Sequence, residues 1–258
     1  MEKGSKRGFA RFRSMERPGF VTHLRSVLGA ARREVGATAA LLVLAGGVWL
    51  FTGIAGEMAE GETHAADFAV LNTLREHGRP DDALGPHWVQ TAATDLTSLG
   101  STTVLTLIVI LVAGLFLVLR RPSGALILLL AAGGGSLISE GLKAVFGRER
   151  PPMAYHAVQT LNTSFPSGHA TLSAVVFLTL GTVAARLVKR RREKVYVMAA
   201  SVLIALLVGV TRVYLGVHWA SDVLAGWCVG AAWAMACWLM AWGWQRLRRP
   251  GATAPPAP

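Results

Sequence analysis

The stretch that decides the fold is PSGHATLSAVVFLTLGTVAARLV, residues 166–188. It opens with the turn sequence Pro166-Ser167-Gly168-His169 and continues from Ala170 as an apolar run. That run is about as long as a helix that crosses a bilayer, which takes roughly 20 residues. Polar and ionisable side chains at the edge of a span are costly unless they have a function. The stretch therefore predicts a membrane helix with a functional site at its first residues.

Five further apolar stretches flank this one, which predicts an all-α, polytopic membrane protein with six transmembrane helices. The 258 residues are 52% hydrophobic and 16% charged, and the mean hydropathy is +0.44, too apolar for an ordinary soluble domain. Cys228 and Cys237 share the last span and cannot bridge to each other on one helix. The predicted spans are 35–56, 98–119, 122–142, 170–188, 195–211 and 223–245.

Positive charge is distributed unevenly between the two ends of these spans. Segment 57–97 carries eight acids against Arg75 and Arg79. If the six spans alternate, most of the 26 Lys and Arg fall on the other side: nine in 1–34, two in 120–121, five in 189–194 and three in 246–249. The positive-inside rule makes that side the cytoplasm. Segment 57–97 and the polar clusters in 143–169 and 212–222 are then all extracytoplasmic.

The parts outside the spans are short. Residues 1–34 form a basic cytoplasmic segment, in which an interfacial amphipathic helix is one interpretation and a disordered leader is equally open for 1–18. Residues 35–245 form the membrane domain. The Pro- and Ala-rich end, 246–258, is predicted to be a disordered cytoplasmic tail. The net charge of +11 lies at cytoplasmic span ends, where topology and anionic lipid account for it. We therefore predict contact with the bilayer and no nucleic-acid partner.

Three cations, Lys143, Arg150 and Arg212, are brought by this topology to one outer pocket. An anion would neutralise their mutual repulsion, and phosphate suits both the forked guanidinium and the point charge of lysine. Ser167 and Gly168 precede a predicted helix, so their backbone N–H groups can point at a bound anion. These five residues are the predicted phosphate-binding set.

Two histidines supply the chemistry. His218 and Asp222 are four residues apart at the predicted start of the last span, which places them on one helical face. The carboxylate can hold Nδ1 of the ring and leave Nε2 free to attack phosphorus. His169, from another loop, is the predicted general acid. The residues thus predict phosphoryl transfer through a phosphohistidine with no metal and no other cofactor, because the cations supply the charge stabilisation.

Other residues near these clusters are predicted to have structural roles. Glu140 is expected to pair with Lys143 or Arg148, and Arg148 is expected to be a solvated loop charge rather than a phosphate ligand. The glycines of 133–135, and the pair at 226 and 230, are expected to permit close helix packing. The histidines of 57–97 have no metal-ligand spacing.

The three clusters resemble the three-part signature of the type 2 phosphatidic acid phosphatase (PAP2) superfamily. Lys-x6-Arg-Pro matches 143–151, Pro-Ser-Gly-His matches 166–169, and Ser-Arg-x5-His-x3-Asp matches 211–222 with Thr211 in place of the usual serine. The resemblance implies a PAP2/haloperoxidase-like helical core, with His218 as nucleophile, His169 as acid and Asp222 as the orienting residue. It implies phosphate binding by Lys143, Arg150, Ser167, Gly168 and Arg212.

These observations predict a multi-pass enzyme of the bacterial inner membrane with cytoplasmic termini. It is expected to remove phosphate from a membrane lipid phosphate or diphosphate at the periplasmic face. The spans argue against the soluble haloperoxidase branch. Two alternatives stay open: a phosphotransferase that passes the phosphoryl group to a lipid acceptor, and a catalytically silent lipid-binding or transport protein. The residues do not separate undecaprenyl diphosphate, phosphatidylglycerol phosphate and phosphatidic acid.

Overall fold

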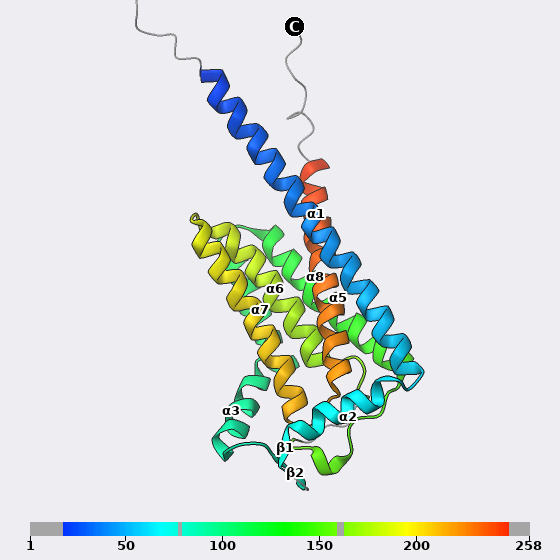
Figure 1. The fold of residues 1–258 in the computed structure, drawn as a ribbon. Helices are drawn as coiled ribbons and strands as arrows, with labels where there is room; N and C mark the ends of the chain where they lie inside the picture. The colour runs from blue at the N-terminus through cyan, green and yellow to red at the C-terminus, as the bar shows by residue number, and fades with distance from the viewer. Residues whose placement is uncertain (1–17, 77–78, 159–162, 248–258) are drawn as a thin grey trace, which may run out of the picture. The chain divides into compact units, whose positions relative to one another are not determined.

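A computed structural model describes residues 18–76, 79–158 and 163–247 (Figure 1). The chain divides into two compact units, Met1–Ala39 and Ala40–Pro258, and the three-part division made from the sequence stays a prediction. Most described residues are helical: α1 Pro18–Ala59, α2 Thr63–Thr73, α3 His87–Ser98, α4 Thr102–Val118, α5 Pro122–Phe146, α6 Gly168–Leu187, α7 Arg191–Tyr214 and α8 Ala220–Leu247. Residues 1–17 and nearly all of the predicted tail lie outside the described ranges, and the predicted interfacial helix overlaps the start of α1.

The predicted all-α membrane architecture is confirmed. Within the described ranges, five helices are long and apolar enough to cross a bilayer: Glu34–Ala59 of α1, then α5, α6, α7 and α8. A sixth candidate span is the pair α3 and α4, which meet at an angle of 47°. The predicted spans coincide with these helices, although α7 extends several residues beyond 195–211 at both ends.

The predicted span 98–119 begins later than expected, because the chain bends at Gly100 and Ser101. Ser101 has extended backbone angles and its hydroxyl accepts the N–H of Val104 at 3.3 Å, which caps α4. A Cβ on Gly100 would lie 2.3 Å from Val208 Cγ1, so only glycine lets this bend approach α7 so closely. The bend separates α3 from the 17 residues of α4.

Helix α6 packs against α5, α7 and α8 and lies among them in the ribbon (Figure 1). Its approach to α8 depends on two glycines, as expected from their spacing. A Cβ on Gly226 would lie 2.8 Å from the carbonyl oxygen of Ser167, and a Cβ on Gly230 would lie 2.6 Å from that of Thr171. The missing side chains let the two backbones come into contact, which is how small residues hold membrane helices together.

Segment 57–97 folds into α2, a two-stranded antiparallel sheet and α3, with β1 at Arg75–Glu76 and β2 at Arg79–Ala83. Arg75 is buried and donates to the carbonyl oxygens of Pro80, Tyr155 and Tyr214, each at 2.9 Å. Tyr155 belongs to the short helix η1, Met153–Tyr155, and Tyr214 ends α7. The segment is therefore fastened to the connections that carry the predicted clusters.

Candidate active site

The predicted site residues lie at adjoining ends of four helices. Lys143 and Arg212 are in the last turns of α5 and α7. Gly168 and His169 open α6, and Asp222 lies in the first turn of α8. The connections between these helices supply the remaining three, Arg150, Ser167 and His218. All eight predicted residues therefore come from the α5–α6 and α7–α8 junctions.

Two left-handed glycines shape these junctions. Gly147 has φ +56° and its N–H donates to the carbonyl oxygen of Lys143 at 3.0 Å, which ends α5. Gly216 has φ +71° just after α7, and a Cβ there would lie 2.0 Å from the carbonyl oxygen of Tyr155. A side chain at position 216 would thus both strain the backbone and push the α5–α6 connection away from the α7–α8 connection.

His218 and Asp222 are in contact, with Nδ1 3.4 Å from Oδ2. The expectation that both lie on a helical face is wrong in detail, because α8 begins at Ala220 and His218 precedes it. The contact forms across the helix start: the Asp222 carboxylate accepts the N–H of Trp219 at 2.9 Å, as the acid of a capping box does. Asp222 is 0% exposed, so its orientation is set by the protein.

The opposite nitrogen of His218 faces Arg150. Arg150 Nη1 lies 3.2 Å from Nε2 of His218 and 2.6 Å from the carbonyl oxygen of Val217. Arg150 Nη2 also donates to the carbonyl oxygen of Thr163 at 3.4 Å. A guanidinium has no acceptor, so it can lie on Nε2 only where that nitrogen carries a lone pair. This arrangement places the proton of His218 on Nδ1, next to Asp222.

Burial lowers the pKa of His218 to about 4, against the opposing hydrogen bond and charge of Asp222, while the charges of Arg150 and Arg212 lower it further. The ring is therefore neutral at physiological pH. A neutral imidazole with its Nδ1 proton held by a carboxylate presents an available electron pair on Nε2. That is the protonation state a nucleophilic histidine requires.

The amide of Ser167 is occupied within the described part of the protein, whereas its hydroxyl is not. Its N–H donates to the carbonyl oxygen of Asp222 at 3.0 Å, so the prediction that this N–H points at an anion is wrong. The Ser167 hydroxyl is buried and has no hydrogen-bond partner among the described residues, and the same holds for Nε of Arg212. Buried polar atoms are normally satisfied, so two such atoms in one predicted phosphate pocket are consistent with an absent polar ligand.

Lys143 reaches the start of α6 because residue 168 is glycine. A Cβ on Gly168 would lie 3.2 Å from Lys143 Nζ and 3.6 Å from the Ser139 hydroxyl. The lysine also pairs with Glu140 at 2.9 Å, as predicted, although the glutamate side chain is 64% exposed. An ion pair with so exposed a partner is weak, so it fixes the position of the lysine little.

His169 and Arg212 belong to the same group. The charges of Lys143, Arg150 and Arg212 all act on the His169 imidazole, as does His218. The His169 ring is half-buried. A Cβ on Gly100 would lie 3.3 Å from Cδ2 of His169, so the bend between α3 and α4 packs closely against this ring. Arg212 is 4% exposed and its Nη1 donates to the Thr97 hydroxyl of α3 at 3.2 Å.

Comparisons with known proteins show which family this chain belongs to. Residues 124–246 match the model of the PAP2 superfamily. Phosphatidylglycerophosphatase B of Bacillus subtilis (strain 168) is 37% identical over 147 residues, which cover 55% of this chain and 70% of that protein. The chain belongs to the PAP2 superfamily. Its fold also matches the crystal structure of the transmembrane PAP2 type phosphatidylglycerolphosphate phosphatase from Bacillus subtilis, with a TM-score of 0.70 and 26% identity over 81% of this chain and 98% of that one.

An undecaprenyl-diphosphatase from Sulfolobus acidocaldarius is also similar, with 35% identity over 68 residues, 26% of this chain and 29% of that protein. The PAP2 match at 124–246 contains all three polar clusters. Thr211, the departure from the PAP2 signature, uses its hydroxyl to donate to the carbonyl oxygen of Val208 at 2.7 Å. The threonine hydroxyl is thus occupied within α7, which explains why either hydroxyl residue fits there.

Two residues around His218, Ser164 and Asp67, were not predicted from the sequence, and the prediction for a third, Arg148, was wrong. Arg148 is not a solvated loop charge, because its side chain is 9% exposed and pairs with both Asp67 and Asp222 at 2.7 Å. Ser164 is fully buried and its hydroxyl donates to Asp222. Asp67 lies in α2, far from the signature in sequence. Its signal was an acid four residues before Leu71, on the face of α2 that is buried.

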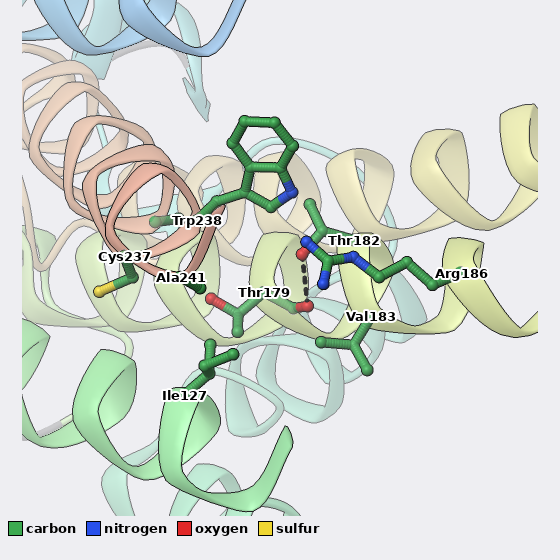
Figure 2. Close-up of a pocket in the computed structure, with 9 residues that line it drawn as sticks. Ile127, Thr179, Thr182, Val183, Arg186, Cys237, Trp238 and Ala241 are labelled. Atoms are coloured by element: carbon green, nitrogen blue, oxygen red, sulfur yellow. Dashed lines mark hydrogen bonds between the residues drawn. The ribbon is translucent and has the colours of Figure 1, made fainter. Parts of the chain in front are cut away.

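A small pocket lies at the other end of α6 and is separate from this site. Figure 2 shows Thr179, Thr182 and Arg186 of α6 facing Trp238 of α8 and Ile127 of α5, with the Thr182 hydroxyl donating to the carbonyl oxygen of Thr179 at 2.8 Å. Its volume of about 10 Å³ is close to the space that one water molecule needs. It contains none of the predicted site residues and is too small for a lipid head group.

Proposed function

We propose that this protein removes phosphate from a membrane lipid phosphate or diphosphate through a covalent phosphohistidine on His218. The observation that carries the proposal is the placement of the two His218 nitrogens. Nδ1 faces the buried Asp222 carboxylate at 3.4 Å and Nε2 faces the Arg150 guanidinium at 3.2 Å. One nitrogen is thus held by an anion while the other lies where cations would bind the phosphoryl oxygens.

In the first step the Nε2 lone pair of His218 forms a bond to phosphorus as the bond to the leaving oxygen breaks. His169 donates a proton to that oxygen, so the lipid leaves as an alcohol or as a monophosphate. The imidazole becomes a positively charged phosphoimidazolium with its proton still on Nδ1. Asp222, within 3.4 Å of that nitrogen, stabilises the charge that develops.

In the second step water attacks the same phosphorus and the nitrogen–phosphorus bond breaks. His169, now neutral, accepts a proton from the water, which returns both histidines to their starting states and releases inorganic phosphate. Lys143, Arg150 and Arg212 bind the phosphoryl oxygens through both steps, together with the Ser167 hydroxyl, and the missing side chain at Gly168 lets Lys143 reach the start of α6. We propose that these groups make the reaction independent of a metal, since they supply the charge that a metal provides elsewhere.

We propose a lipid as the substrate because the site lies at the ends of membrane-spanning helices. An amphiphile can keep its chains in the bilayer there while its phosphate enters the cationic pocket. The distribution of Lys and Arg supports an extracytoplasmic site in a bacterial inner membrane, with both termini in the cytoplasm. The related phosphatidylglycerophosphatase and undecaprenyl-diphosphatase make phosphatidylglycerol phosphate and undecaprenyl diphosphate the first substrates to test.

The test is phosphate release by the purified protein from a panel of lipid phosphates and from a soluble phosphate monoester. We expect turnover of at least one lipid, abolished in His218→Ala and strongly reduced in His169→Ala. His87→Ala is the matched control, because His87 is exposed in α3 and outside the site. Full activity of His218→Ala would overturn the proposal. Transfer of labelled phosphate to an added lipid alcohol, in place of its release, would make the protein a phosphotransferase.

A further inference from the structure

Arg148 joins two carboxylates from different parts of the chain. Its Nη1 donates to Asp222 Oδ1 and to the Ser221 hydroxyl, both at 2.7 Å. Its Nη2 donates to Asp67 Oδ2 at 2.7 Å and to the Thr63 hydroxyl at 3.1 Å. The planar guanidinium has the fork geometry that such bridging needs, which a lysine lacks. Arg148 thus connects α2 directly to the carboxylate behind the predicted nucleophile.

Asp67 is held on its other side by the first turn of α8. Asp67 Oδ1 accepts the N–H of Ser221 at 2.9 Å and Oδ2 accepts the Ser221 hydroxyl at 2.6 Å. The carboxylate therefore satisfies a free backbone N–H at a helix N-terminus, where negative charge is favoured. Trp219 covers the group, since its ring lies 5.6 Å from the Arg148 guanidinium and 4.8 Å from the Phe68 ring.

The two carboxylate oxygens of Asp222 have different partners. Oδ1 binds Arg148, whereas Oδ2 accepts the Trp219 N–H and the Ser164 hydroxyl and faces Nδ1 of His218. Asp67, Arg148 and Asp222 are 3%, 9% and 0% exposed, so water screens their charges little. Two carboxylates and one guanidinium leave a net charge of −1 beside His218. Without Asp67, the charge of Arg148 would cancel that of Asp222.

We propose that Asp67, contributed by segment 57–97, is a positioning residue for the reaction: through Arg148 it fixes the orientation of Asp222 and preserves the negative charge that supports His218. This inference rests on the proposed function, because it assigns a role around the same nucleophile. Asp67 itself touches neither the predicted phosphate pocket nor His218. Its effect should therefore appear in the chemical step rather than in substrate binding.

The charged groups around His218 decide the direction of the pH effect. Arg150 from the α5–α6 connection and Arg212 from α7 disfavour its protonated form, and Asp222 from α8 favours it. His169 from α6 also interacts with the ring. Replacing Asp67 by Asn leaves all of these groups in place and adds one uncompensated positive charge at Arg148. The protonated form of His218 is then less favourable. The acid limb of the pH profile, where kcat/KM falls because His218 becomes protonated, therefore moves to lower pH.

The experiment compares Asp67→Asn with Asp67→Glu, which keeps the charge, and with Asp81→Asn, an exposed acid of the same segment. For Asp67→Asn we expect kcat to fall about tenfold or more, because small misplacements of reacting groups cost up to about 100-fold. We expect KM to change little and the acid limb of the kcat/KM profile to move to lower pH. Asp67→Glu should leave the acid limb in place, and Asp81→Asn should match the wild type.

Wild-type kcat and an unmoved acid limb in Asp67→Asn would overturn the inference, as would a loss that appears equally in KM. If Asp67→Asn does not fold, Arg148→Lys keeps the charge but cannot bridge both carboxylates, and an unchanged kcat there would also overturn the inference. His218→Ala is assayed in parallel. An active His218→Ala protein would remove the proposed function itself, whereas an inactive one beside a normal Asp67→Asn would remove only the role of Asp67.

Discussion

Arg150 Nη1 lies 3.2 Å from Nε2 of His218, the nitrogen that is proposed to carry the phosphoryl group. In the proposed mechanism a substrate phosphate would draw the Arg150 guanidinium away from Nε2 and so free that nitrogen to attack phosphorus. Binding of the anion and exposure of the nucleophile are thus one event.

Arg150→Lys should lower kcat/KM by about 100-fold or more, the range seen when one donor to a developing oxyanion is removed. A lysine ammonium is a compact point charge without the rigid planar fork that lets Arg150 contact the Val217 carbonyl and present further N–H groups in fixed directions. Steady-state kinetics on the preferred lipid would measure the effect. Arg79→Lys, at an exposed ion pair with Asp82, is the control and should leave kcat/KM unchanged.

The stability contributed by His218 should depend on pH. Burial lowers the pKa of His218 to about 4 in the folded protein, below the ordinary value of about 6.5. The folded state therefore resists protonation of His218. The contribution of this histidine to the free energy of unfolding is fully present above the unfolded pKa and is lost as pH falls through the folded pKa of about 4. Thermal unfolding from neutral to acid pH should show the wild type losing stability relative to His218→Gln.

Gly230→Ala should destabilise the protein and reduce activity. The new Cβ would lie 2.6 Å from the Thr171 carbonyl oxygen and 2.7 Å from the Ala174 Cβ, so α8 has to move away from α6. Forcing extra atoms into such a contact costs about 1–3 kcal/mol. The movement would also separate Asp222 from His169, since each opens one of these helices. Gly133→Ala, where a Cβ meets nothing within 4 Å, should be neutral or slightly stabilising in the same unfolding assay.

Gly168→Ala should raise KM several-fold without unfolding the protein. Its Cβ would lie 3.2 Å from Lys143 Nζ, the flexible end of a side chain that can move aside. The lysine would then no longer reach the start of α6, where the phosphate is proposed to bind. Kinetics combined with a thermal melt would separate the two effects. Gly141→Ala, with open space at its Cβ in the same helix as Lys143, should leave KM unchanged; a similar rise there would contradict the proposal.

Chelation of divalent metals should leave activity intact, because cationic side chains supply the charge in the proposed mechanism. The measurement is phosphate release before and after dialysis against EDTA, with the lipid presented in a neutral detergent so that metal effects on the substrate surface are excluded. Loss of activity in EDTA that returns with added Mg²⁺ or Zn²⁺ would contradict the metal-independent proposal.

Much of the fold followed from the sequence because membrane spans leave a strong local signal. A run of about 20 apolar residues has few alternatives to a transmembrane helix, and Lys and Arg mark its cytoplasmic end. The bend at Gly100 was not predicted, since the span predicted from the apolar stretch begins at residue 98, whereas α4 begins at Thr102. The residues at the bend fit it locally, with Ser101 capping α4, whereas the close approach of Gly100 to Val208 in α7 depends on segments that are far apart in the sequence.

The sequence by itself determined the membrane class, the PAP2 signature and the eight residues predicted for the site, because each depends on residue type and spacing along the chain. Only the tertiary structure decided that Ser167 offers its hydroxyl, that Arg148 is buried, and that Asp67 reaches Asp222 through it. The physical reason is that desolvation and pairing of charges depend on which segments meet in space. Asp67 and Arg148 are 81 residues apart, and only the packing of α2 against the start of α8 brings them together.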